Sequence, residues 1–262
     1  PRSVPRLMAN AASRDRRPAA LIPGVGRLEG IAAGIAARLA DDGWDLALSY
    51  LRAYDADTAP GSRDDEPERI AADLRGRGAR VSLINADIAD PEVPERLVAA
   101  AKEALGPLRG LVLSHAESRD SGILDTTIEA FDRHMAVNAR ASWQLMVAFA
   151  RQVDGGGSIV ALTSDAIVNN VPYGASKGAL DRVVRAAAVE LAPMGIRANA
   201  VNPGPVDTGW MDDELREILA RRQPTGRLGT PADVAKLVAF LLSDDGAWTT
   251  GQLIHTDGGF SL

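Results

Sequence analysis

Tyr173 and Lys177 are the residues of this chain whose types and spacing most directly suggest catalysis. They stand four positions apart at the start of a predicted helix, so both side chains project from one face. A tyrosine hydroxyl with its ordinary pKa of about 10 is a poor base at neutral pH, and an adjacent ammonium group favours its ionised form. Ser164 ends the preceding predicted strand, where its hydroxyl could hydrogen-bond a substrate oxygen. The three residues together predict proton transfer to or from that oxygen.

A glycine-rich turn at residues 24–30 is the second feature with a chemical use. Gly24, Gly26 and Gly30 follow an apolar run and precede Ile31, where helical spacing of apolar residues begins. Glycines in such a turn let the backbone approach a phosphate, which free N–H groups and the positive end of the helix dipole stabilise. The last two glycines are one residue further apart than in the dinucleotide fingerprint. A pyrophosphate seat is therefore one interpretation, and a tight connection without a ligand is the other.

The elements that must position these residues follow a regular order. From residue 19 the chain alternates short runs rich in Val, Ile and Leu with longer stretches at helical spacing, as in βαβ units around a parallel sheet. We therefore predict an α/β protein with a single-domain Rossmann fold, a doubly wound parallel sheet flanked by helices. The predicted strands are residues 19–22, 45–50, 80–85, 108–113, 158–163, 197–201 and 252–255. The predicted helices are residues 31–41, 68–75, 94–105, 131–153, 174–192 and 231–242.

Two polar stretches interrupt this order. Residues 53–67 carry Asp, Gly, Ser and Pro without periodicity, so we predict a loop that is either a lid or an insertion. Residues 204–227 are polar and compatible with a helix, and they follow the sixth predicted strand. In open α/β sheets such late excursions often cover the ligand.

The composition sets the domain count and the compartment. A chain of 262 residues, 46% of them apolar, can bury one large core, so we expect one domain over residues 18–262. Residues 1–17 are rich in Arg, Ser and Pro, and we expect a disordered leader. They start without methionine, which leaves open whether part of the leader was added to the native chain.

Several classes of partner are disfavoured by the same composition. A net charge of −6 argues against nucleic acid as a partner. The chain has no cysteine, and its three histidines lie far apart, so we predict no metal site. No apolar run approaches the roughly 20 residues needed to cross a bilayer. We expect a soluble, cytoplasmic protein without a membrane partner.

The active-site residues also resemble a known family. The segments that carry the resemblance are YGASKGAL at 173–180, ELAPMGIRANAVNPGPVDT at 190–208 and TTGQLIHTDGGF at 249–260. They are similar to short-chain dehydrogenases/reductases, and 3-oxoacyl reductases in particular. The resemblance implies that Tyr173 is the acid/base and that Lys177 lowers its pKa and binds the nicotinamide ribose. It makes Ser164 the catalytic serine, and it makes Asn138, in AVNARAS, the holder of a water in a proton relay.

The resemblance extends to the cofactor site. It implies that the segment containing Pro203 and Gly204, with Thr208 beyond, flanks the nicotinamide, and that Asp87 lies near the adenine. The candidate cofactor-binding residues are Gly24, Gly26, Arg27, Gly30, Ile31, Arg52, Asp87, Ile88, Ser114, Tyr173, Lys177, Pro203, Gly204, Val206 and Thr208.

The sequence departs from the family pattern at several positions. Pro23 and Ala32 replace a threonine and a glycine of the usual turn, and residues 113–116 read Leu-Ser-His-Ala where Asn-Asn-Ala-Gly is usual. The span from Ser164 to Tyr173 is about four residues shorter than usual, which would reshape the substrate cleft. His115 could be an additional acid, although a single histidine beside a strand end is more often structural.

The choice of cofactor is predicted from the end of the second strand. NAD sites usually place Asp or Glu about 20 residues beyond the glycine turn, where it repels a 2′-phosphate. Tyr50 stands there instead, and Arg27 and Arg52 could bracket a 2′-phosphate. We therefore expect NADP(H) in preference to NAD(H); the alternative is that both arginines are solvated surface residues.

The activity expected from these features is the interconversion of a ketone and a secondary alcohol by hydride transfer. The substrate is left open between 3-oxoacyl thioesters, sugars, polyketides and simple ketones. An enoyl reductase is the alternative enzyme, since the glycine turn resembles that branch, but such enzymes place their Tyr and Lys further apart. A non-catalytic nucleotide-binding regulator is the third possibility. The resemblance also implies a homotetramer or homodimer, and alanine-rich faces at 175–192 would permit close packing.

Overall fold

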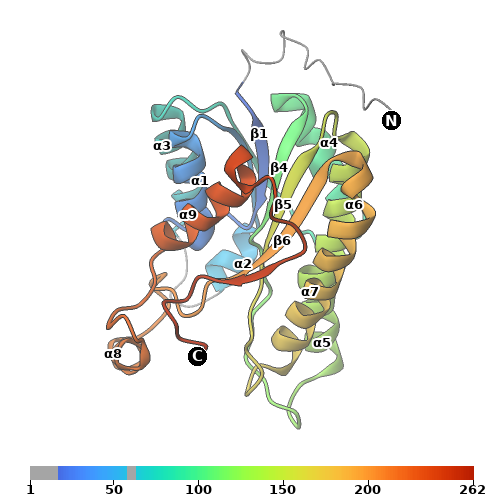
Figure 1. Cartoon of the computed structure of the whole chain (residues 1–262). Coiled ribbons are helices and arrows are strands. Elements are labelled where there is room, and N and C mark those ends of the chain that lie inside the picture. Colours follow the sequence, from blue (N-terminus) through green and yellow to red (C-terminus); the bar gives the residue numbers. More distant parts are fainter. Residues whose placement is uncertain (1–16, 58–62) are drawn as a thin grey trace, which may run out of the picture.

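The computed structural model describes residues 17–57 and 63–262, which are built around a seven-stranded parallel sheet (Figure 1). The strands are β1 (Ala19–Pro23), β2 (Asp45–Tyr50), β3 (Val81–Asn85), β4 (Leu108–Leu113), β5 (Gly157–Leu162), β6 (Ile196–Asn202) and β7 (Leu253–His255). Their order in the sheet is β3-β2-β1-β4-β5-β6-β7, so the chain winds outward in both directions from the β1–β4 pair. This order confirms the predicted doubly wound Rossmann fold, with every strand within one residue of its predicted ends.

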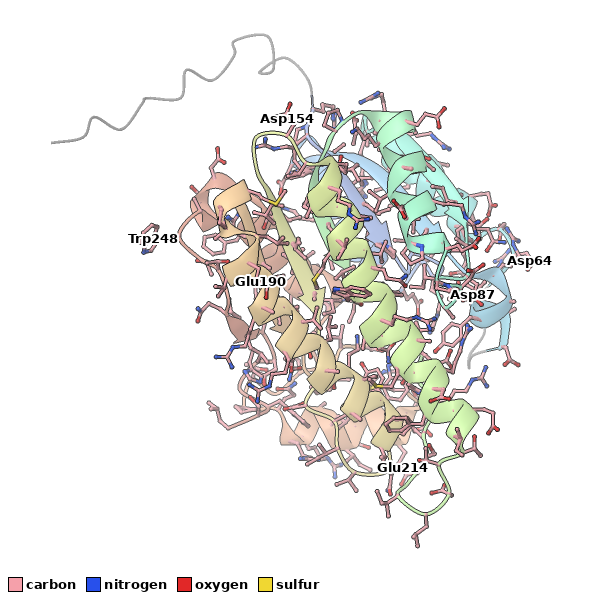
Figure 2. The ribbon with its side chains drawn as sticks, turned by 90° about the vertical axis from the view of Figure 1, so that its right-hand side faces the viewer. Asp64, Asp87, Asp154, Glu190, Glu214 and Trp248 are labelled. Atoms are coloured by element: carbon pink, nitrogen blue, oxygen red, sulfur yellow. The ribbon has the colours of Figure 1, made fainter. Side chains whose placement is uncertain are left out.

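Helices cover both faces of the sheet, and each face has its own hydrophobic core (Figure 1). The helices are α1 (Ile31–Asp41), α2 (Arg52–Asp57), α3 (Glu66–Gly76), α4 (Val93–Leu105), α5 (Ile128–His134), α6 (Ser142–Gln152), α7 (Val171–Glu190), α8 (Asp213–Arg222) and α9 (Pro231–Leu242). One core packs Ile35 of α1 and Val238 of α9 against the sheet. The other packs Leu97 of α4, Phe149 of α6 and Val184 of α7. Figure 2 looks onto this second layer of helices.

The sheet brings the candidate residues to one edge. β1 and β2 are buried along their whole length, and the polar Asp45 and Ser49 of β2 are buried together with its apolar residues. Pro23, which lacks an N–H group, stands at the last position of β1, paired in register with Ser49 of β2. Because all strands are parallel, the glycine turn after β1, residues 114–120 after β4 and Ser164 after β5 emerge at the same edge.

The prediction of a loop over residues 53–67 was wrong in part. Residues 52–57 form α2, a short helix that buries no residue completely, and α3 already begins at Glu66. The N–H groups of Tyr54 and Asp55 donate to the Leu51 carbonyl, and the Tyr54 hydroxyl accepts from the backbone N–H of Ser118 at 3.0 Å. A tertiary contact rather than an apolar period thus holds α2, which is why the pattern did not predict it. Residues 58–62 of the predicted loop lie outside the described residues.

The predicted helix at residues 131–153 is three segments. α5 begins after Thr127, whose side chain accepts from Ala130 N, and a π-helical segment (Met135–Ala141) then separates α5 from α6. π-helical turns inside α-helices are rare and occur often at functional sites. Hydrophobic periodicity does not reveal one extra residue in a turn, so the sequence predicted a continuous helix.

Three further predictions concern the leader, residues 204–227 and membrane spans. Residues 1–16 of the predicted leader lie outside the described residues, and Arg17 donates to the Ala40 carbonyl at 3.0 Å and pairs with buried Asp45. Within residues 204–227 the helix-compatible sequence forms α8, capped by the Asp212 side chain, which accepts from Leu215 N. No helix within the described part of the chain is both long and apolar enough to cross a membrane.

Candidate active site

A cleft of about 810 Å³ opens at the carboxyl ends of the strands, where the strand order reverses between β1 and β4. Open α/β sheets bind their ligands at this position. The sequence-predicted residues that line the cleft are Gly24, Gly26, Arg27, Gly30, Ile31, Asp87, Ile88, Ser114, Ser164, Tyr173 and Thr208. Asn138, Lys177, Pro203, Gly204, Val206 and Arg52 are not part of its lining.

Tyr173 enters the cleft from the first turn of α7. Pro172 precedes it in that turn, where the missing proline N–H costs no helical hydrogen bond. Burial raises the pKa of the Tyr173 hydroxyl to about 12, and a hydrogen bond with the Ser164 hydroxyl opposes the rise. The Tyr173 hydroxyl therefore keeps its proton at neutral pH and can act as a donor to a ligand oxygen.

Lys177 lies one helical turn beyond Tyr173 and is enclosed by protein. Its Nζ donates to the Leu162 carbonyl oxygen at 2.8 Å and lies 5.6 Å from the centroid of the Tyr173 ring. Burial lowers the pKa of Lys177 to about 8, and the Asp181 carboxylate opposes that fall. The side chain is thus mainly cationic at neutral pH, with its charge one helical turn from Tyr173.

Asn138 lies behind the cleft, buried within the π-helical segment. Its Oδ1 accepts from the backbone N–H of Glu117 at 2.7 Å, and its Nδ2 donates to the Glu117 carbonyl at 2.9 Å. The same Nδ2 donates to the Ser176 hydroxyl at 2.8 Å, and that hydroxyl donates to the Tyr173 carbonyl at 2.7 Å. Asn138 therefore connects the chain after β4 to the turn of α7 that carries Tyr173.

The glycine turn requires Gly24. Its φ of +91° strains any residue with a side chain, and a Cβ there would lie 2.7 Å from the His115 Cα. The Gly24 N–H donates to the Ser49 carbonyl at 2.8 Å, which folds the turn over the end of β2. α1 starts after Gly30, and no side chain of the described residues caps its first turn. Its N–H groups are therefore available to an anionic ligand in the cleft.

The Asp55 carboxylate of α2 lies against this turn, which the sequence did not predict. A Cβ on Gly26 would lie only 1.9 Å from Asp55 Oδ2. Burial raises the pKa of Asp55 to about 6, although the neighbouring Arg27 lowers it. An ionised Asp55 opposes the binding of an anion at the glycine turn, because like charges repel.

His115 is a buried, neutral residue of the cleft wall. Its Nε2 lies 3.2 Å from the Val137 carbonyl oxygen and 3.1 Å from the Ser142 hydroxyl. Burial, reinforced by the positive charge of Lys177, lowers the pKa of His115 to about 3. Because the acidic imidazolium form is absent at neutral pH, His115 fits a structural role better than that of an additional acid.

The two candidate phosphate-binding arginines have different environments. Arg27 lines the cleft and donates to the Thr208 carbonyl at 3.0 Å, which connects the glycine turn to the chain after β6. Arg52 stacks over the Tyr50 ring and pairs with Glu68 of α3 at 3.0 Å. Only Arg27 of the two therefore faces the cleft in this structure.

The sequence missed a group of polar residues beside the cleft. Glu117 is buried, and its carboxylate pairs with Arg119 at 3.2 Å and Arg133 at 3.3 Å. Arg133 also pairs with Asp87, labelled in Figure 2, at 3.0 Å. Tyr54 of α2 lines the cleft and adds to the rise in the Tyr173 pKa. Glu117 follows a predicted strand, but the two arginines that pair with its buried carboxylate approach it only in the folded chain.

Known proteins resemble the chain over nearly its whole length. The family model described as enoyl-(acyl carrier protein) reductase matches residues 24–261. The chain is 34% identical over 256 residues to Uncharacterized oxidoreductase YjdA of Bacillus subtilis (strain 168), covering 95% of this chain and 98% of that relative. It is 34% identical over 249 residues to the Arabidopsis thaliana protein named NADPH-dependent aldehyde reductase-like protein, chloroplastic. That match covers 90% of this chain and 92% of the relative. A solved short chain dehydrogenase from Burkholderia cenocepacia J2315 in complex with NADP superposes with a TM-score of 0.84 at 32% identity, covering 94% and 98%.

Proposed function

The chain belongs to the short-chain dehydrogenase/reductase family of oxidoreductases, and we propose that it interconverts a ketone and a secondary alcohol with a nicotinamide cofactor. The observation that carries the proposal is the Tyr173 hydroxyl in the cleft, hydrogen-bonded by Ser164 and backed by the buried ammonium of Lys177. These groups are suited to moving one proton to or from a single oxygen atom.

The cleft has features that suit a dinucleotide. The uncapped first turn of α1 and the backbone of the glycine turn at Gly24 and Gly26 would hold the pyrophosphate. Asp87 and Ile88 after β3, and Ser114 after β4, would flank the adenosine half, and Thr208 would lie beside the nicotinamide. The resemblance to the family adds Pro203, Gly204 and Val206 on the nicotinamide side, although they do not line the cleft here. When bound, the nicotinamide supplies or accepts the hydride.

The chain's own residues handle the proton. In the direction of reduction, Ser164 donates a hydrogen bond to the substrate carbonyl oxygen, and Tyr173 donates its proton to the same oxygen as the alcohol forms. Lys177 stabilises the tyrosinate that remains, until a proton from solvent restores it. In the direction of oxidation the tyrosinate takes the alcohol proton. Asn138 keeps the first turn of α7 in place through Ser176.

NADP(H) is the cofactor that we propose. Arg27 faces the cleft, and β2 ends in Tyr50 without a carboxylate to repel a 2′-phosphate. The NADP complex of the Burkholderia cenocepacia structure supports this choice. The test compares kcat/KM for NADPH and NADH in the wild type, Arg27→Ala and Arg52→Ala. We expect Arg27→Ala to lose more of the NADPH preference than Arg52→Ala, because Arg52 must leave Glu68 to reach the cofactor. A wild type that prefers NADH would contradict the proposal.

An enoyl reductase is the second candidate, favoured by the description of the matching family model. The four-residue spacing of Tyr173 and Lys177 favours carbonyl chemistry. NADPH oxidation measured with ketones and with 2-enoyl thioesters separates the two. Turnover of the enoyl thioesters alone would replace the proposal, and a chain that binds NADPH without turning over either class would be a regulator. We further propose a cytoplasmic homotetramer or homodimer.

A further inference from the structure

Four large aliphatic side chains project into solvent from two loops at the mouth of the cleft. Ile123 and Leu124, between β4 and α5, are 80% and 97% exposed. Ile167 and Val168, between β5 and α7, are 77% and 78% exposed. These four residues form what we call the aliphatic rim. Single exposed apolar residues are common, whereas a group of them marks a surface that another molecule covers.

The two loops lie together and have defined conformations. The backbone N–H of Val171 donates to the Ser121 carbonyl at 3.0 Å, which joins one loop to the other. A Cβ on Gly174 would lie 2.1 Å from the Ala166 carbonyl oxygen, so the second loop lies directly on the first turn of α7. Asn169 has a φ of +56°, a conformation that few residues with side chains adopt. The rim is therefore held outward by specific backbone contacts.

The aliphatic rim follows residues of the cleft lining along both loops, although its own four side chains are not part of that lining. Ser164, Ala166 and Tyr173 line the cleft, and the exposed Ile167 and Val168 follow in the same loop. Ser118 and Asp120 line it from the other loop, ahead of Ile123 and Leu124. A substrate with its oxygen at Tyr173 would thus extend its remaining atoms toward aliphatic carbon.

The charges on the two loops restrict the substrate further. Asp120, Asp125 and Asp165 are exposed or half-exposed, and within the described residues none of them forms an ion pair with a cation. Arg119 is already paired with Asp57 at 2.6 Å and with Glu117. An anionic carrier, such as the phosphates of a coenzyme A thioester, would therefore meet uncompensated carboxylates at this mouth.

We infer that the substrate is an uncharged ketone or secondary alcohol whose apolar chain or ring system packs on the aliphatic rim. This inference rests on the proposed function above. Each methylene that becomes buried between substrate and rim should raise kcat/KM about fourfold, in line with the transfer free energy of a buried CH₂ group. A sugar of the same size has too little apolar surface to cover the four aliphatic side chains of the rim.

The experiment measures kcat/KM with NADPH for 2-alkanones from 2-butanone to 2-decanone and for 3-oxodecanoyl coenzyme A. The paired variants are Ile167→Ser with Val168→Ser, and Ile123→Ser with Leu124→Ser. The matched control is Trp248→Ser, a fully exposed side chain that is labelled in Figure 2. Trp248 precedes β7 and so lies toward the amino ends of the strands, away from the cleft. We expect kcat/KM to rise with chain length in the wild type and the control. In both paired variants, the ratio of kcat/KM for 2-decanone to kcat/KM for 2-butanone should be at least tenfold smaller than in the wild type. The activity of these variants with 2-butanone should be kept.

Three results would overturn the inference. They are a wild-type kcat/KM independent of chain length, paired variants that keep the full rise, and 3-oxodecanoyl coenzyme A preferred over the ketone of equal length. Light scattering of the same variants identifies the competing occupant: a fall in mass without a change in the chain-length series would assign the rim to a second copy of this chain. If no ketone of any length reacts, the proposed function fails as well, so the two failures are distinguishable.

Discussion

Replacing Lys177 by methionine is expected to make the protein more stable while abolishing its activity. The side chain is buried, and burial lowers its pKa from 10.5 to about 8. That difference corresponds to about 3 kcal/mol of unfavourable free energy for holding the ammonium group in the folded chain at neutral pH. Methionine has similar length and no charge. Losing the hydrogen bond from Nζ to the Leu162 carbonyl lowers the stability by about 1 kcal/mol. A net increase of about 2 kcal/mol in the free energy of unfolding is therefore expected at pH 7.

The gain should depend on pH in a defined direction. Below pH 8 the lysine is protonated in both the folded and the unfolded state, so the wild type carries the full cost. Between about pH 8 and 10.5 the unfolded chain binds more protons than the folded one, and wild-type stability rises with pH. The advantage of Lys177→Met should therefore shrink by about 2 kcal/mol between pH 7 and pH 9.5.

The assay is urea unfolding of the cofactor-free protein at both pH values, followed by extrapolation to water. Lys102→Met on the exposed face of α4 is the control, and its stability should stay within about 0.5 kcal/mol of the wild type. A Lys177→Met protein no more stable than the control at pH 7, or a gain that persists unchanged at pH 9.5, would refute the assignment of a buried, charged lysine.

The remaining predictions concern the cleft and the assembly. Tyr173→Phe should abolish turnover, because it removes the proton donor alone, and NADPH binding measured by fluorescence titration should be kept. A variant that still turns over at the wild-type rate would contradict the mechanism. Gly24→Ala should lower NADPH affinity at least tenfold and destabilise the fold by about 1–3 kcal/mol, since its φ of +91° and the 2.7 Å approach to His115 leave no room for a Cβ. Asp55→Asn should raise NADPH affinity at pH 8 and change it little at pH 5, because a carboxyl with a pKa of about 6 is ionised only at the higher pH; an equal effect at both values would exclude charge repulsion. Light scattering should give the mass of a dimer or tetramer, and a monomer would refute the proposed assembly.

The sequence by itself determined the sheet and the local positions of the candidate residues. Runs of buried aliphatic residues placed every strand within one residue, because the side-chain directions along a strand or a helix follow from the local geometry of the backbone. The same local rules set Tyr173 and Lys177 on one face of α7 and put Ser164 just past β5. The glycine turn was visible because a positive φ at Gly24 needs a residue without a side chain.

Only the tertiary structure decided the pKa values of these residues and the groups that surround them. The helix α2 and the π-helical segment around Asn138 are held by contacts with the chain after β4, more than 60 and 20 residues away respectively in sequence. Arg52 is paired with Glu68 of α3, and Asp55 lies at the glycine turn, because the fold brings α2 against both segments. The pKa values of Tyr173, Lys177 and His115 depend on burial, which distant segments create together. Local spacing carries no record of these contacts, because desolvation and pairing depend on distance in space and not on distance along the chain.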